Sequence, residues 1–338
     1  MNDLHIFLAN VWLVFLGLFL ALYVVLDGFD LGIGVLSLFA RQQERRNIMV
    51  ASMASVWDAN ETWLVLVGGV LFGAFPLAYA IALNALYLPI VTMLFALMFR
   101  GVAFEFREHS RDKGLWDIAF GLGSTLATVC QGFSLGGLIG GVSVKDGHYS
   151  GGAFDWLSPF SAFVALGAVF GYVLLGATYL IMKTEKEQQR HSRRQAWIAG
   201  SLMMLAAVVV SVWTPLRYPF VATKWFGAGS LYWFAVPPLF AVFCAAMLAR
   251  ALVKRYEHAP FFWSIGIFVA SFAGLAASLY PYIVPRAVTV VDAAADNMTL
   301  TSMLLGIGLL IPVMLAYNAY QYIVFRGKVT ASGHGDHL

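Results

Sequence analysis

Nine long apolar segments constrain this sequence more than any other feature, because each is long enough to cross a lipid bilayer. They cover residues 8–40, 48–75, 77–100, 116–141, 158–182, 196–215, 230–252, 261–284 and 299–325. A spanning helix needs about 20 mostly apolar residues. Only 12% of the 338 residues are charged, whereas a soluble domain has roughly a quarter. We therefore predict an all-α polytopic membrane protein with about nine transmembrane helices.

The basic residues predict the orientation of these helices. All but four of the 21 Lys and Arg residues follow the first, third, fifth, seventh or ninth segment, and the four others are Lys145, Arg217, Lys224 and Arg286. Loops rich in Lys and Arg stay on the cytoplasmic side. We therefore expect a periplasmic N-terminus and a cytoplasmic C-terminus. A missed or invented helix would scramble this alternation, so the alternation also supports a count of nine.

Short connections make successive helices antiparallel neighbours, which favours bundles. We expect two four-helix bundles and one peripheral helix. The predicted divisions are a first bundle with the acidic motifs at 1–141, an outer loop at 142–157, a second bundle at 158–284, an outer loop and ninth helix at 285–325, and a cytoplasmic tail at 326–338.

Four carboxyl groups interrupt the first two segments. Asp27 and Asp30 lie in LDGFDLGIG, and Asp58 and Glu61 lie in WDANETW. At 1.5 Å per residue, Asp27 lies ~20 Å and Asp58 ~16 Å from the cytoplasmic loops. The members of each pair are three residues apart and so share a helix face. Two antiparallel helices would therefore bring all four carboxyls together in the cytoplasmic half.

Ionisable groups inside a membrane usually face a bundle interior or a wet cavity and mark ion or proton routes. The structural alternative is that such carboxyls cap broken helices, with Gly28 and Gly32 marking an unwound turn. For four carboxyls at matched depth, we favour a proton pathway formed by Asp58, Asp30, Asp27 and Glu61.

Other residues have weaker assignments. Trp57 beside the second acidic pair packs against helices or against a flat ligand ring. Arg100 and Glu105, in FRGVAFEFR, form a cluster that either marks the membrane boundary by snorkelling or has a functional role. All seven histidines fall in loops or at helix ends, so mid-span bis-histidine haem ligation has no candidates. We expect no metal site and no catalytic residue in this chain.

The motifs LDGFDLGIG, WDANETWLV and FRGVAFEFR, in this order and spacing, resemble subunit II of cytochrome bd-type quinol oxidases. The match is specific over about residues 10–110, and GATYL at 176–180 adds softer support. The short chain looks closer to the compact, cyanide-insensitive branch. Ala59 departs from the family's usual glycine (WDGNETW) without changing a polar group.

The resemblance implies a complex that oxidises quinol and reduces oxygen to water with protons taken from the cytoplasm. The b-type haems and haem d would belong to the partner, subunit I, and a small single-helix accessory subunit and a structural quinone are further expected partners. Asp58 would be a principal relay carboxylate, with Asp27 and Asp30 on the same route. Trp57 would lie where a structural quinone contacts subunit II in some members, and Arg100 and Glu105 would organise the cytoplasmic mouth. The chain would be a multi-pass inner-membrane protein.

Two other functional classes stay open from the residues alone. A proton- or cation-coupled secondary transporter could use the same carboxyls to bind its coupling ion. A purely structural anchor subunit would need Asp27 and Asp58 for assembly only. A visible spectrum of the gently purified chain separates a lone transporter from an oxidase subunit.

Overall fold

The computed structural model describes residues 3–227, 231–330 and 333–334. Its helices are α1 (Asp3–Leu38), α2 (Gln43–Met53), α3 (Trp57–Ala74), α4 (Pro76–Ala85), α5 (Tyr87–His109), α6 (Gly114–Gly140), α7 (Pro159–Lys183), α8 (Lys186–Arg217), α9 (Pro219–Phe226), α10 (Leu231–Val253), α11 (Ala259–Leu279), α12 (Val290–Ala293) and α13 (Asn297–Val324). Its strands form three two-stranded antiparallel hairpins: β1 (Val144–Lys145) with β2 (His148–Tyr149), β3 (Tyr282–Val284) with β4 (Val288–Thr289), and β5 (Val329–Thr330) with β6 (Gly333–His334).

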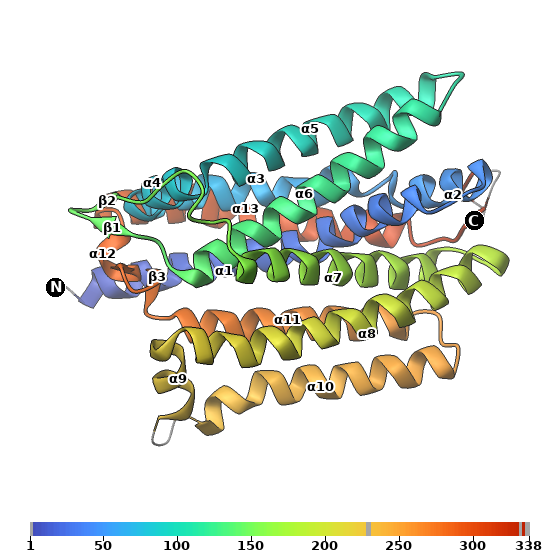
Figure 1. Ribbon diagram of the computed structural model, residues 1–338. Helices are drawn as coiled ribbons and strands as arrows, with labels where there is room; N and C mark the ends of the chain where they lie inside the picture. Colours follow the sequence, from blue (N-terminus) through green and yellow to red (C-terminus); the bar gives the residue numbers. More distant parts are fainter. Residues whose placement is uncertain (1–2, 228–230, 331–332, 335–338) are drawn as a thin grey trace.

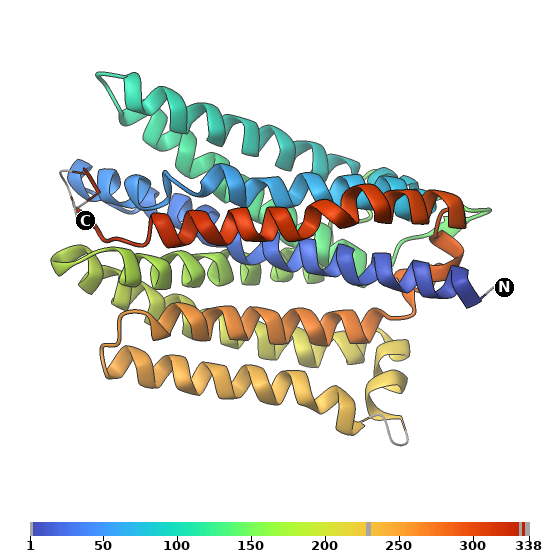
Figure 2. The ribbon, with the colours of Figure 1, turned by 180° about the vertical axis from the view of Figure 1, so that it is seen from behind.

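The long helices run side by side along one axis, with α1 in the middle (Figure 1). Helix α1 packs against α3, α6, α7 and α13, while α5 and α6 lie on one side of it and α8, α10 and α11 on the other. Figure 2 shows α13 lying beside α3 and α1 on the opposite face. Residues of the first and last segments are thus neighbours in the folded chain (Figure 2).

Eight of the described helices are long and apolar enough to cross a membrane: α1, α5, α6, α7, α8, α10, α11 and α13. Helix α3 is not among them, although it runs alongside α1 for its whole length (Figure 2). Its first turns carry Asp58, Asn60 and Glu61, which lower its hydropathy. The fold is therefore an all-α polytopic membrane protein.

The prediction of one continuous helix over 48–75 is wrong. A turn at residues 54–56 separates α2 from α3, so Asp58 lies in the first turn of a helix and not in mid-helix. Tyr179 of α7 donates a hydrogen bond to the carbonyl oxygen of Ser52 (3.3 Å) just before this turn. Backbone groups released by a break inside a membrane need such internal partners. The local sequence pattern did not predict the break, because the hydrogen bond that supports it comes from Tyr179, which is distant in the sequence.

The segment predicted over 77–100 is also divided. Helix α4 begins with Pro76, whose missing N–H suits the first turn of a helix, and α5 begins after Leu86. The segment predicted over 261–284 ends as a helix at Leu279 and continues into β3. In each case the apolar run extends past the helix end, because hydropathy does not report where a backbone turns.

The glycines of LDGFDLGIG do not mark an unwound turn, because α1 is continuous through them. They allow α1 and α7 to touch backbone to backbone. A Cβ added to Gly32 would lie 1.8 Å from the carbonyl oxygen of Tyr172, and one added to Gly176 would lie 2.6 Å from the amide nitrogen of Ile33. Small residues at such crossings are typical of membrane helix packing. This contact fixes the rotation of α1 and therefore the direction of Asp27 and Asp30.

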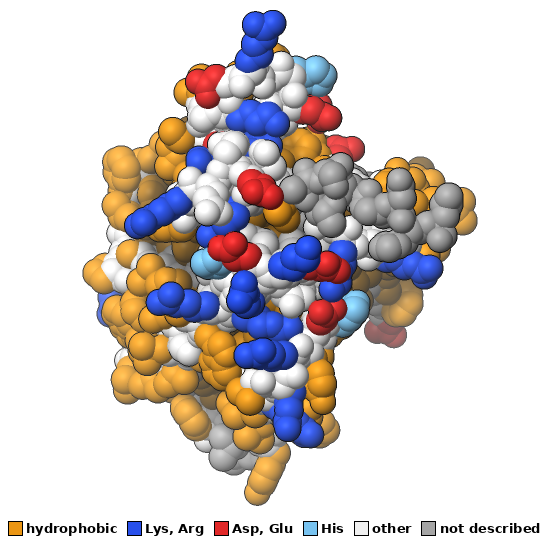
Figure 3. All heavy atoms as spheres, turned by 90° about the vertical axis from the view of Figure 1, so that its right-hand side faces the viewer, with side chains coloured by type: hydrophobic (Ala, Val, Ile, Leu, Met, Phe, Trp, Pro, Cys, Tyr) orange, Lys and Arg blue, Asp and Glu red, His pale blue; other side chains and the backbone are white. Residues whose placement is uncertain are grey.

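Lys and Arg side chains gather at one end of the bundle, which Figure 3 shows face-on and which we call the basic end. It contains α2, the α5–α6 and α7–α8 turns and the end of α13 (Figure 1). Of the predicted tail 326–338, residues 331–332 and 335–338 lie outside the described residues. In the described part, Lys328 forms ion pairs with Glu257 (2.8 Å) and Glu185 (3.6 Å), and the Lys183 ammonium donates to the carbonyl oxygen of Phe325. These contacts attach the end of the chain to the α7–α8 and α10–α11 turns.

Candidate functional site

Asp27 of α1 forms a buried ion pair with Arg100 of α5. The Nη1 atom of Arg100 donates to Oδ1 of Asp27 at 2.7 Å, and the side chains are 1% and 0% exposed. A buried charge is tolerated only where a partner and hydrogen bonds compensate for lost solvation. The snorkelling alternative for Arg100 is therefore wrong, because a snorkelling side chain ends in water. Local sequence patterns do not predict this pairing, because the two residues are 73 positions apart.

Asp30 lies one turn further along α1 and joins a second buried group. Its Oδ2 atom accepts a hydrogen bond from Nδ2 of Asn60 on α3 (2.8 Å), and Oδ1 of Asn60 accepts one from the Tyr322 hydroxyl on α13 (2.8 Å). The amide of Asn60 thus connects three helices. The bond also shows that the two acidic motifs lie at the same level of the bundle. Asn60 stands inside the WDANETW motif, but its residue type alone did not indicate this bridging position.

Asp58 and Glu61 lie beside this buried group rather than in it. Asp58 is exposed on the isolated chain, and its carboxylate makes no hydrogen bond with other described residues. Glu61 is half-buried and lies within electrostatic reach of Arg100, Asp27 and Asp58. The four predicted carboxyls are therefore neighbours, but two are enclosed and Asp58 points out of the chain.

Trp57 and Glu105 flank the same region. The indole of Trp57 is half-buried, packs against Phe104 (centroids 5.1 Å apart) and covers Gly101 of α5. Packing against helices is thus observed for Trp57, whereas contact with a quinone ring stays a prediction. Glu105 is exposed on α5. Its carboxylate does not join the buried ion pair formed by Arg100 on the same helix.

A further polar group lies one turn from Asp27 on α1. Gln131 of α6 donates from Nε2 to the Tyr23 hydroxyl oxygen (2.6 Å) and accepts from the Tyr172 hydroxyl of α7 (2.6 Å). This group extends the polar interior of the bundle from α1 to α7. The position of Gln131 inside an apolar segment could have indicated this polar group, because a buried amide needs hydrogen-bond partners within the protein.

At the basic end, Asp117 of α6 holds the nearby elements together. It accepts hydrogen bonds from Nε of Arg107 on α5 (2.5 Å) and from Gln43 on α2 (2.8 Å), while Nη2 of Arg107 reaches Asn47 on α2 (2.7 Å). Arg107 and Asp117 are 5% and 4% exposed. This buried polar group fixes α2 across the ends of α5 and α6 at the basic end.

The central site contains buried polar atoms that have no hydrogen-bond partner among the described residues, and these atoms determine its chemistry. Oδ2 of Asp27, Oδ1 of Asp30, and Nε and Nη2 of Arg100 are buried without a hydrogen-bond partner among the described residues. Within residues 3–227, 231–330 and 333–334, no group of three or more His, Cys, Asp and Glu side chains is placed to hold a metal ion. The arrangement suits the binding and transfer of protons, because carboxyls with free oxygens can both accept and release protons.

Comparison with known families decides the assignment. Residues 8–325 match the family described as cytochrome bd terminal oxidase subunit II. The chain belongs to this family. Its relatives include the cytochrome bd-I ubiquinol oxidase subunit 2 of Escherichia coli strain K12, which is 29% identical over 96% of this chain and 95% of that protein. The cytochrome bd ubiquinol oxidase subunit 2 of Bacillus subtilis strain 168 is 25% identical over 96% and 97%.

The fold agrees with this family. A chain in the structure of bd oxidase from Geobacillus thermodenitrificans aligns with a TM-score of 0.74 and 19% sequence identity, over 94% of this chain and 99% of that one. The predicted resemblance is thus confirmed, and subunit II of cytochrome bd is part of a quinol oxidase, an oxidoreductase. The chain is a multi-pass protein of the bacterial inner membrane. Family membership also implies subunit I as its partner and places the haems in that partner.

Proposed function

We propose that this subunit II carries protons from the basic end of the bundle, through the group formed by Asp27, Asp30, Glu61 and Asp58, to the oxygen-reducing centre of subunit I. The observation that carries the proposal is the position of Asp58. Asp58 is exposed on the isolated chain and lies one helical turn before Glu61 on the same side of α3. Glu61 in turn interacts electrostatically with the buried Arg100–Asp27 ion pair. A proton path from the interior of this chain toward a neighbouring subunit would therefore pass from the buried Asp27 and Asp30 through the half-buried Glu61 to the exposed Asp58.

The charge balance of the buried group supports proton storage. Arg100 compensates one negative charge, that of Asp27. Asp30 has the neutral Asn60 as its partner, and an unpaired buried carboxylate is costly. A proton on one of these carboxyls removes that cost. Because the carboxyls interact, the proton belongs to the group and not to one residue.

The exposed face of α3 supports contact with subunit I. Asp58, Thr62, Val65, Gly69 and Phe72 are all exposed and follow the spacing of one helix face. An aspartate facing lipid is costly, and a Cβ added to Gly69 would meet nothing within 4 Å. A partner helix lying on this face would shield Asp58 and could approach closely at Gly69.

We also propose an orientation of the chain in the membrane and the composition of its assembly. The gathering of Lys and Arg at one end supports a cytoplasmic basic end and a periplasmic N-terminus. Helix α3, which packs against both α1 and α13, supports a count of nine spanning helices. We further propose that this chain holds no haem itself, and that an accessory single-helix subunit and a structural quinone beside Trp57 complete the assembly.

Replacement of Asp58 by asparagine tests the pathway. The complex of Asp58→Asn with subunit I should assemble with normal haem absorbance but consume oxygen roughly tenfold or more slowly, because an amide cannot release and regain a proton. Thr62→Val is the matched control. It lies one turn along the same face, its hydroxyl donates to the Asp58 carbonyl oxygen of its own helix (3.0 Å), and its turnover should be unchanged.

The same measurement separates the alternatives. Full turnover of Asp58→Asn across neutral and alkaline pH would show that Asp58 is not a relay residue. Loss of assembly instead of turnover would favour the anchor hypothesis. The transporter hypothesis has no support from the comparisons, and co-purification of b-type and chlorin absorbance with the chain would exclude a lone transporter.

A further inference from the structure

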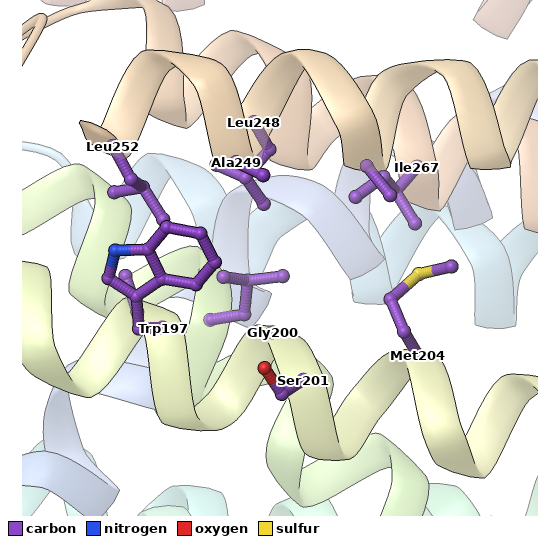
Figure 4. Close-up of a pocket in the computed structure, with 11 residues that line it drawn as sticks. Trp197, Gly200, Ser201, Met204, Leu248, Ala249, Leu252 and Ile267 are labelled. Atoms are coloured by element: carbon purple, nitrogen blue, oxygen red, sulfur yellow. The ribbon is translucent and has the colours of Figure 1, made fainter. Parts of the chain in front are cut away.

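An apolar groove of about 210 Å³ lies between α8 and α10, outside the acidic site (Figure 4). Trp197, Gly200 and Met204 line it from α8, and Leu248 and Leu252 line it from α10. From Trp197 to Met204 the groove follows α8 for about 10 Å. It is therefore elongated along the helix axis, which is the direction that an acyl chain takes in a membrane.

The groove has a closed floor and an open side. Leu174 of α7 and Ile267 of α11 form the floor and are 0% and 1% exposed. Trp197 and Ser201 lie on the open side, where Trp197 is 42% exposed. Gly200 leaves room at the centre, because a Cβ there would lie 3.5 Å from Cδ1 of Leu174. The groove is thus a recess that lipid can enter from the side.

Two arginines lie just beyond the end of the groove nearest the basic end of the bundle. Arg193 lies one helical turn before Trp197, and its Nη2 atom donates to the carbonyl oxygen of Arg255, just past Leu252, at 2.8 Å. Its Nη1 atom is buried without a hydrogen-bond partner among the described residues. The Arg255 side chain acts on Arg193 as a second positive charge. Two cations with an unused buried donor suit an anionic acceptor.

The acidic residue in this neighbourhood is already engaged. Glu257 acts on Arg193 electrostatically, but its carboxylate accepts hydrogen bonds from Lys328 (2.8 Å) and Gln189 (3.2 Å). It therefore leaves the Nη1 donor of Arg193 unused.

We propose that this groove binds an anionic phospholipid of the cytoplasmic leaflet, with its phosphate at Arg193 and Arg255 and one acyl chain between α8 and α10. The choice of occupant follows from the charges. The phosphate supplies the missing acceptor, whereas the ammonium of a zwitterionic lipid would lie near two guanidinium groups. A neutral isoprenoid chain would fill the apolar part and leave the Nη1 atom of Arg193 without an acceptor.

Native mass spectrometry of the purified complex with subunit I tests the proposal. The delipidated complex is titrated with phosphatidylglycerol or with phosphatidylcholine. The wild type should bind phosphatidylglycerol preferentially, and Arg193→Gln should weaken that binding about fivefold with phosphatidylcholine unaffected. Arg190→Gln, which removes an exposed arginine one turn further out, is the charge control and should bind like the wild type.

A second pair of variants tests the acyl part of the site. Gly200→Leu should fill the groove and abolish the preferential binding, whereas Gly200→Ala should retain it because its added methyl makes ordinary contact with Leu174. Arg255→Gln replaces Arg193→Gln if the latter fails to assemble. Equal binding of phosphatidylglycerol by wild type and arginine variants overturns the proposal, and so does retention of a neutral quinone in the groove of both. Turnover does not enter this test, so its result is independent of the proton-path proposal.

Discussion

Arg100 and Asp27 form an ion pair at 2.7 Å between α5 and α1, and both side chains are almost completely enclosed. The pair places the positive charge of one helix against the acidic motif of another. It also leaves Nε and Nη2 of Arg100 and Oδ2 of Asp27 without hydrogen-bond partners among the described residues. The site is therefore held together by charge while retaining atoms that can bind or exchange protons.

Breaking this pair should destabilise the subunit strongly. Arg100→Gln or Asp27→Asn leaves the other charge buried and unpaired, so each should cost about 3–5 kcal/mol of unfolding free energy. The double variant should be less destabilised than the sum of the two, because neither charge remains. Thermal unfolding of the purified complex measures all three. Additive effects in the double variant would mean that the two residues do not stabilise each other.

Asn60 should matter for both stability and turnover. Asn60→Leu removes the partner of Asp30 and of Tyr322 together, and buried polar groups without partners cost about 1–3 kcal/mol each. Tyr322→Phe removes only the second bond and should cost less. Both stability and oxygen consumption should fall more in Asn60→Leu than in Tyr322→Phe. Equal effects would mean that the bond to Asp30 contributes nothing.

The contact between α1 and α7 should not tolerate a side chain at Gly32. A Cβ there would lie 1.8 Å from a backbone carbonyl oxygen, so Gly32→Ala must separate the two helices and should reduce the yield of assembled oxidase. Gly306→Ala in α13 is the control, because its Cβ would meet nothing within 4 Å and alanine favours helix by about 1 kcal/mol. Blue-native electrophoresis compares the two. Normal assembly of Gly32→Ala would contradict the close contact.

The attachment of the chain end should depend on pH through Glu257. Hydrogen bonds from Lys328 and Gln189 lower the pKa of the Glu257 carboxyl below its ordinary value of 4.5. A lowered folded-state pKa stabilises the attachment above pH 4.5, and this contribution is lost as the pH falls through the folded-state value. The protection of the amides of residues 325–330 from hydrogen exchange, expressed relative to the intrinsic exchange rate at each pH, should therefore fall below about pH 4.5. Glu257→Gln should remove this dependence, and an unchanged profile in that variant would contradict the assignment.

The sequence predicted the class of fold and the main chemical feature of the site. Apolar runs identified the membrane helices, because a bilayer requires long uninterrupted apolar segments. The matched acidic motifs also predicted that Asp27, Asp30, Asp58 and Glu61 would be neighbours. The Asn60–Asp30 hydrogen bond shows that the two motifs do lie at one level. Local patterns suffice for these features because hydropathy and helical spacing are properties of short segments.

Only the tertiary structure decided the partners and the exposure of these residues. The Arg100–Asp27 pair joins positions 73 apart, and the Tyr322–Asn60 bond joins positions 262 apart. Asp58 was expected in the bundle interior, but it faces out of the chain because the helix breaks before α3. Tyr179 of α7 donates a hydrogen bond to the carbonyl oxygen of Ser52 just before this break. No local pattern encodes these contacts. They depend on how α1 is rotated against α7, which the backbone contact at Gly32 and Gly176 fixes.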